Sequence, residues 1–349
     1  MKRIFVLLNV ITLMFAGCKV VDDDPVVVSL GQGVFIVNQG NFTAGNASLS
    51  YFEPGILKKY NNLFSDVNGI PLGDVAQSIT LDDSNAYIVV NNSGLIQVLG
   101  RWNAKFKGKI SNLGSPRYML KISENKAYVS DLFKNAITII DPASLQVTGE
   151  IPVGRSTEEM VRLGNSVFAA NWTGYNQSAV NDKVLVIDVD QDKLVDSIQV
   201  GIEPNSMVLD KNNTLWVLCS GGYENTEIPS LWKIDANTRQ VIDTLIFPEL
   251  ASNPNNLEQN GDRDSLFYLN YGIFRMSIGD TTLPEDVFIG EDPDMVFLCL
   301  GVDPTTSEIY VSDPKNYQVN GRVYRFGPNG GMRSNMEVGI VPGAFGFNY

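Results

Sequence analysis

The 349-residue sequence contains no histidine. Imidazole is the general base of Ser-His-Asp and Cys-His sites and a common zinc ligand, so these arrangements are excluded. The chain also lacks a phosphate-binding GxxxxGK loop, a GxSxG turn and paired CxxC motifs. Catalysis would have to rest on carboxylates, Lys or Tyr, and we therefore expect a protein that is not an enzyme.

Cysteine and positive charge are scarce as well. Beyond Cys18 the chain has only Cys219 and Cys299, both within apolar strand-like runs, and we interpret them as buried core residues. A disulfide between these two is possible, but nothing in the sequence requires it. The 39 acidic residues outnumber the 26 basic ones and give a net charge of -13. Nucleic acid and anionic membrane surfaces are therefore not expected partners.

Long hydrophobic runs are confined to the N-terminus, where residues 4–15 are apolar and follow Lys2 and Arg3. This run is shorter than the roughly 20 residues of a membrane-spanning helix and is typical of a secretion signal. The small residues before Cys18 resemble a bacterial lipobox. The resemblance implies a signal peptide over residues 1–17 and lipidation of Cys18, and a plain signal peptide is the alternative.

An acidic run, Asp22 to Asp24, follows Cys18 within the expected tether of residues 18–32. It resembles the export signal that sends lipoproteins to the outer surface of Gram-negative bacteria. The resemblance implies a cell-surface lipoprotein of the outer membrane that contacts the membrane only through its lipid anchor. A solvated tether without export information is the alternative.

An aromatic-led strand recurs along the remaining chain, as in "AYIVVN", "AYVSD" and "IYVSD". The seven copies begin their aromatic at Phe35, Tyr87, Tyr128, Phe168, Trp216, Phe267 and Tyr310. Spacing of roughly 40 to 50 residues matches a four-stranded propeller blade. The sequence therefore predicts an all-β fold, a seven-bladed β-propeller formed by residues 33–349 as a single domain.

Two segments, "AYVSDLFKNAITIIDPASLQVTGEIPVG" and "VLVIDVDQDKLVDSIQVG", resemble the YVTN/YncE-type propeller repeat of bacterial surface proteins. The final segment "IVPGAFGFNY" supplies an inner strand without the partners of a full blade. The missing strands are found in "GVFIVNQ", "ASLSYFEP" and "ILKKYNNLF" at the other end. We expect the N- and C-terminal strands to pair in one blade and close the ring.

In such a ring, the connections after the second strand of each blade and between blades open on one face. Polar residues recur at the end of the aromatic strand on that face, and those chosen as candidate ligand-binding residues are Asn38, Asn91, Asp131 and Asn171. Asn and Asp side chains readily cap their own turns, so a purely structural role is the alternative.

The same loops carry aromatic residues that folding does not require. The candidates are Phe42, Phe133, Trp172, Tyr175, Tyr223, Tyr271 and Tyr317, with local packing as the alternative. Arg117 and Arg155 could hold a phosphate or carboxylate, or could form ion pairs with neighbouring acids. Asp188, Asp190 and Asp192 lack the Gly and distal Glu of a calcium loop, so no metal site is predicted.

The combination of lipobox, sevenfold YVTN-type ring and long amide- and aromatic-rich loops resembles the BtuG-like cobalamin-binding lipoproteins. The resemblance implies that cobalamin or another corrinoid is the transported ligand, with no built-in cofactor, and that an outer-membrane TonB-dependent transporter is the partner. The residues leave alternatives open: a propeller that binds glycan or another transported ligand, a protein-interaction scaffold, or a His-free lyase or lactonase.

Overall fold

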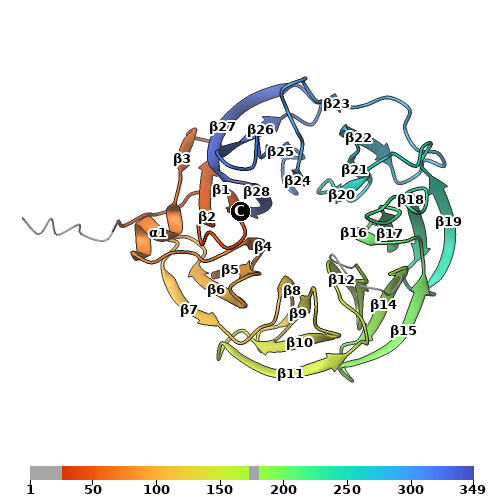
Figure 1. The fold of residues 1–349 in the computed structure, drawn as a ribbon, viewed down its shortest axis with the longest axis horizontal. Helices are drawn as coiled ribbons and strands as arrows, with labels where there is room; N and C mark the ends of the chain where they lie inside the picture. The colour runs from red at the N-terminus through yellow and green to blue at the C-terminus, as the bar shows by residue number, and fades with distance from the viewer. Residues whose placement is uncertain (1–25, 173–180) are drawn as a thin grey trace, which may run out of the picture.

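The computed structural model describes residues 26–172 and 181–349. Within these residues, seven four-stranded antiparallel sheets surround a central axis (Figure 1). The prediction of an all-β, seven-bladed β-propeller is confirmed. No helix in the described part of the chain is long and apolar enough to cross a bilayer.

The blades follow one another along the chain, each with its innermost strand first. The second and third sheets around the ring contain β4 (Ala76–Leu81), β5 (Asn85–Val90), β6 (Leu95–Gly100) and β7 (Phe106–Ile110), then β8 (Pro116–Ser123), β9 (Lys126–Asp131), β10 (Ala136–Asp141) and β11 (Gln146–Pro152). The next two contain β12 (Met160–Leu163), β13 (Ser166–Ala170), β14 (Lys183–Asp188) and β15 (Lys193–Gln199), then β16 (Pro204–Leu209), β17 (Thr214–Cys219), β18 (Ser230–Asp235) and β19 (Gln240–Ile246). The last two contain β20 (Asn255–Gln259), β21 (Ser265–Leu269), β22 (Gly272–Ser277) and β23 (Ile289–Gly290), then β24 (Cys299–Val302), β25 (Ile309–Asp313), β26 (Asn320–Phe326) and β27 (Met332–Ile340).

The remaining blade joins the two ends of the described chain. Its strands are β28 (Pro342–Asn348), β1 (Gly33–Asn38), β2 (Ser48–Glu53) and β3 (Lys58–Tyr60), in that order from the axis outward. β1 pairs antiparallel with β28, so that Val34 lies opposite Phe347 and Ile36 opposite Phe345. The C-terminus therefore lies near the axis of the ring (Figure 1), and the predicted closure is confirmed.

The second strand of each blade is buried on both faces, which explains its continuous apolar sequence. In three of the blades, an aspartate at the face opposite the long loops accepts a hydrogen bond from the aromatic residue of this strand. The Tyr87 hydroxyl donates to Asp82 Oδ2 at 3.0 Å, and the Trp216 indole N–H donates to Asp210 Oδ2 at 3.0 Å. The repeated aromatic residue fills the core in every blade, and in the case of Tyr87 and Trp216 its polar atom is also hydrogen-bonded.

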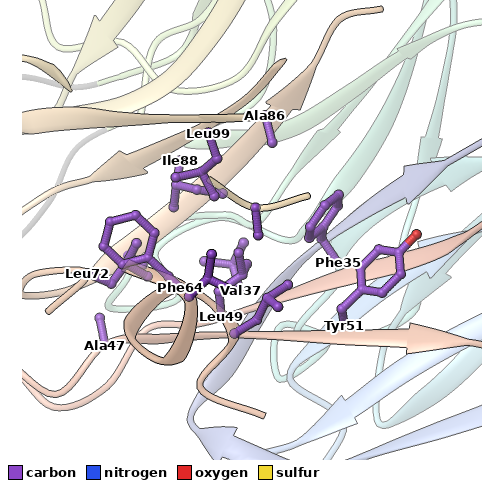
Figure 2. Packing of buried hydrophobic residues seen from close by; sticks show 14 of the residues in the cluster. Phe35, Val37, Ala47, Leu49, Tyr51, Phe64, Leu72, Ala86, Ile88 and Leu99 are labelled. Carbon is purple, nitrogen blue, oxygen red and sulfur yellow. The ribbon is translucent and has the colours of Figure 1, made fainter. Parts of the chain in front are cut away.

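One short helix, α1 (Leu63–Asn68), leads from the closing blade to the next. Leu63, Phe64 and Val67 bury its inner face, and Figure 2 shows Phe64 beside Val37 and Leu49 of the closing blade. Elsewhere in the core, Cys219 and Cys299 are buried free thiols. The interpretation of these two cysteines as core residues agrees with their positions.

Candidate functional site

The long connections of blades four to six, counted from the closing blade as blade one, surround a cavity of about 500 Å³ on the loop face. Trp172, Tyr223 and Tyr271 line this loop-face hollow together with amide side chains that include Asn205, Asn253 and Asn255. Three aromatic residues predicted from the sequence therefore meet at one place. Flat apolar rings beside amide donors and acceptors suit a large ligand that is itself rich in amides.

Local backbone geometry presents the Tyr271 ring to solvent. Tyr271 has φ 54°, a left-handed conformation uncommon for residues other than glycine, and Gly272 follows with φ 140°. The turn is fixed because Asn270 Oδ1 accepts the Asn253 amide at 2.9 Å and the Tyr271 hydroxyl donates to the Ala251 carbonyl at 3.1 Å. The Tyr271 ring is therefore held in place although 68% of the residue is exposed.

Trp172 is positioned by a buried ion pair below it. The Arg117 guanidinium lies 5.6 Å from the Trp172 ring centre and donates to both carboxylate oxygens of Glu158, with Nη2 to Oε1 at 2.6 Å and Nε to Oε2 at 2.8 Å. Arg117 Nη1 also donates to Gln77 Oε1 at 2.6 Å. Only 14% of the Arg117 side chain and 6% of the Glu158 side chain are exposed. The ion-pair interpretation of Arg117 therefore describes its geometry, and Glu158 is the partner that the sequence did not indicate.

The polar residues at the channel rim are buried and bond within the rim. Asn38 Nδ2 donates to the hydroxyls of Ser48 and Ser50, and Asn91 Nδ2 donates to Ser115 Oγ and the Pro116 carbonyl. Asp131 Oδ1 accepts the amides of Phe133 and Lys134, Asn171 Nδ2 donates to the Ser156 carbonyl, and Arg155 Nη1 donates to Asn171 Oδ1 at 3.3 Å. Of these four residues, Asp131 caps its own turn, which was the structural alternative, whereas Asn38, Asn91 and Asn171 bond to residues at least ten positions away in the chain.

The other predicted aromatics lie outside the lining of the hollow. Phe42 and Phe133 are exposed by 71% and 63%, and Tyr317, with φ 63°, is partly exposed. The Tyr317 carbonyl accepts Asn41 Nδ2 at 2.6 Å, which ties two loops together. Tyr175 lies outside the described residues.

A second cavity, of about 560 Å³, follows the axis of the ring and shares Asn205 and Asn255 with the loop-face hollow. Tyr118, Glu159 and Glu258 line this channel, and sequence reasoning missed all three. The two glutamates could have been found from the sequence, because each lies beside apolar residues of an expected inner strand, in "STEEM" and "NNLEQ". Among residues 26–172 and 181–349, no group of three or more metal-binding His, Cys, Asp or Glu side chains occurs.

The two channel glutamates hold their protons unusually tightly. Burial, with a smaller contribution from the nearby Glu158 charge, raises the pKa of Glu159 to about 8, although Glu159 Oε2 accepts the Met207 amide at 2.7 Å. Burial and then repulsion by Glu159 raise the pKa of Glu258 well above its ordinary value. The channel therefore contains neutral carboxyl groups at moderately acidic pH.

Replacing Glu159 by Gln is expected to flatten the pH dependence of stability. Between about pH 4.5 and about pH 8 the folded protein keeps the Glu159 proton that the unfolded chain loses, so the free energy of unfolding falls as pH rises. One such proton contributes a slope of up to about 1.4 kcal/mol per pH unit. Urea unfolding across this range measures the slope. The exposed Glu124→Gln variant is the control, and an unchanged slope in Glu159→Gln would show that Glu159 titrates normally.

The sequence from residue 32 to residue 338 matches the family model DUF5074, a domain of unknown function. The chain belongs to this family. No curated protein sequence matches the chain.

Solved structures share the propeller architecture at low identity. A quinonprotein alcohol dehydrogenase-like protein from Bacteroides thetaiotaomicron is 15% identical with a TM-score of 0.70, covering 91% of this chain and 78% of its own. The periplasmic gluconolactonase of Pseudomonas aeruginosa is 12% identical with a TM-score of 0.65, covering 91% and 99%. A streptogramin B lyase is 13% identical with a TM-score of 0.56, covering 76% and 83%. At this identity the similarity shows the fold.

The expectation that the protein is not an enzyme needs correction. It rested on the absence of histidine and of a catalytic motif. A gluconolactonase, a streptogramin B lyase and a hydrazine synthase are among the solved structures with this architecture. The fold therefore supports catalysis in other proteins, and the missing motifs do not separate binding propellers from catalytic ones.

Proposed function

We propose that this protein is a cell-surface lipoprotein that captures cobalamin, or a related corrinoid, on its loop face and passes it to an outer-membrane TonB-dependent transporter. The observation that carries the proposal is the loop-face hollow, where Trp172, Tyr223 and Tyr271 meet among Asn side chains. A corrin ring has apolar faces and a rim of amide groups. Aromatic rings can cover the former while Asn205, Asn253 and Asn255 bond to the latter.

The size of the hollow fits partial entry of such a ligand. At about 500 Å³ it is smaller than a whole cobalamin, but Asn205 and Asn255 join it to the channel mouth. A ligand seated on the hollow would extend over that mouth. The exposed rings of Tyr223 and Tyr271 then offer contact area at little cost in conformational entropy, because each ring has two rotatable side-chain bonds.

The charges of the hollow favour a neutral ligand over an anionic one. Glu158 and Glu203 are part of its lining, and the guanidinium of Arg117 is already engaged by Glu158. Arg117 is therefore not proposed as a phosphate ligand. A neutral glycan stacked on the aromatic rings is the competing ligand, and direct binding measurements separate the two classes.

Trp172→Ala is expected to weaken cyanocobalamin binding by about 1 to 3 kcal/mol, which is about a fivefold to 150-fold loss of affinity. The reason is that Trp172 supplies a rigid, partly buried ring to the hollow. Isothermal titration of the purified protein with cyanocobalamin measures the effect. Tyr271→Ala should weaken binding in the same direction.

Trp102→Ala is the matched control, because Trp102 is 40% exposed and its loop, in which the Trp102 carbonyl accepts the Leu30 amide, lies on the face opposite the hollow. It should leave the affinity unchanged. Absence of cyanocobalamin binding at micromolar protein would refute the corrinoid proposal. Binding of neutral oligosaccharides that depends on Trp172, without corrinoid binding, would favour the glycan alternative.

A further inference from the structure

A separate cavity of about 440 Å³ opens on the face opposite the long loops, between the last blade and the closing blade. It is lined by Glu53 and the turn that follows, by Gly31 and Gln32 ahead of β1, and by residues of the last blade that include Arg325. We propose that this cavity binds an organic monocation, an alkylammonium or guanidinium group, through the carboxylate of Glu53. The proposal is independent of the ligand at the loop face.

Glu53 has a buried carboxylate oxygen that receives no hydrogen bond from the described part of the chain. The residue ends β2 and is only 7% exposed, and its Oε1 is buried with no partner among the described residues. Gly31 lets the chain pass close to it, since a Cβ at that position would lie 2.7 Å from Glu53 Oε2. Burying a carboxylate without a donor is costly, and a bound cation that donates hydrogen bonds would offset that cost.

Lys58, the basic residue opposite Glu53 in the sheet, does not form an ion pair with it. Lys58 is the cross-strand neighbour of Glu53 in the β2–β3 pair, but its Nζ lies 4.6 Å from the centre of the Tyr60 ring. No Lys or Arg nitrogen of the described chain lies within 4.0 Å of the Glu53 carboxylate. The natural counter-ion position is therefore available to a ligand.

Arg325, whose guanidinium lies in the cavity wall, donates to both carboxylate oxygens of Glu308. Its Nε lies 2.7 Å from Glu308 Oε2 and its Nη2 lies 2.9 Å from Glu308 Oε1. Arg333, outside the lining, also contacts Glu308 Oε1 at 3.2 Å, so Glu308 has two guanidinium partners, whereas Glu53 has none among the described residues. A cationic ligand would give the Glu53 carboxylate the partner that it lacks.

The shape of the wall favours an organic cation over a metal ion. A hard divalent cation needs six or more oxygen ligands, whereas Glu53 is the single carboxylate of the lining without a cationic partner. Pro54 and Ile56 form an apolar wall beside it, and Ile56 is 67% exposed. An aliphatic stem can lie on this wall while its charged end reaches Glu53, as Lys and Arg stems do on protein surfaces.

Methyl NMR of Ile56 in the isotope-labelled protein tests the proposal. At constant ionic strength, n-butylammonium and n-butylguanidinium should shift the Ile56 methyl resonance in a saturable manner, and 1-butanol should not. Glu53→Gln keeps the shape and removes the charge, and it is expected to lower the affinity at least about tenfold, which corresponds to about 1.4 kcal/mol. Glu124→Gln, an acid whose side chain is 87% exposed, is the control and should leave the affinity unchanged.

Equal shifts with 1-butanol, equal shifts with sodium or potassium chloride, or an unchanged affinity in Glu53→Gln would each overturn the proposal. Two further probes identify the source of the cation. If Nα-acetyl-lysine amide and Nα-acetyl-arginine amide bind as well as the free alkyl cations, the site accepts a side chain of a partner polypeptide. If these capped residues are excluded while the alkyl cations bind, the site is specific for small amines or guanidines.

Discussion

Deleting residues 342–349 is expected to prevent the ring from folding. The deletion removes β28, the innermost strand of the closing blade, and leaves the buried residues Val34 and Ile36 of β1 on an open sheet edge. It also removes the Asn348 side chain, whose Nδ2 donates to the Tyr51 hydroxyl at 2.8 Å. A domain is typically stable by about 5 to 15 kcal/mol, and loss of a whole inner strand approaches that range. Circular dichroism and thermal unfolding of the truncated protein measure the result.

A milder change tests the same closure in a protein that still folds. Arg101 donates from Nε to Asn348 Oδ1, from Nη2 to the Tyr349 carbonyl at 2.6 Å and from Nη1 to the Asp82 carbonyl at 2.9 Å. Arg101→Gln is expected to lower the free energy of unfolding by about 2 kcal/mol, because hydrogen bonds to charged groups are lost. Arg239→Gln removes an exposed pair with Asp196 and should cost less than about 1 kcal/mol. A truncated protein that unfolds at the temperature of the intact one would show that β28 does not hold the ring closed.

Fold and closure could be predicted because they follow from local patterns repeated along the chain. Each blade must bury an apolar second strand, so residues such as Tyr87 and Trp216 recur at intervals set by blade size. Closure followed from counting strands at the two ends, since a ring cannot leave one blade incomplete. These features need no knowledge of which side chains meet across the ring.

The site could be predicted only in part, because the local sequence of one blade does not determine which side chains of other blades it contacts. Trp172, Tyr223 and Tyr271 were found as aromatic residues in long loops, and they do line one hollow. Asn38, in contrast, occupies an equally polar rim position but is fully buried among serine hydroxyls. Whether such an amide faces a ligand or its own rim depends on neighbouring strands.

The two channel glutamates were missed for the same reason. Glu159 and Glu258 belong to different blades and lie far apart in sequence, yet both line one cavity, and repulsion by Glu159 contributes to the raised pKa of Glu258. Alternation along an inner strand does not show that its polar face meets other polar faces at the axis. The orphan carboxylate of Glu53 was missed for a related reason: its cross-strand neighbour Lys58 suggests an ion pair that the structure does not form.

Arg117→Met is expected to lower the free energy of unfolding by about 3 to 5 kcal/mol, because it leaves the buried Glu158 carboxylate without its guanidinium. Although burial acts against the charge of Arg117, the adjacent Glu158 carboxylate keeps the pKa of Arg117 above its ordinary value. The pair also connects three blades, since Gln77 accepts a hydrogen bond from Arg117 Nη1. Urea unfolding at neutral pH measures the loss.

The double variant Arg117→Met, Glu158→Met separates the cost of an unpaired charge from the cost of lost packing. Replacing both partners by apolar side chains removes the stranded carboxylate, so the double variant should be more stable than Arg117→Met. The same proteins report on the loop face. Trp172 would lose the guanidinium 5.6 Å from its ring centre in both variants, so any ligand of the hollow should bind more weakly in the double variant even where stability is regained. A single variant that costs less than about 1 kcal/mol, or a double variant no more stable than the single one, would show that Arg117 and Glu158 behave as an ordinary surface pair.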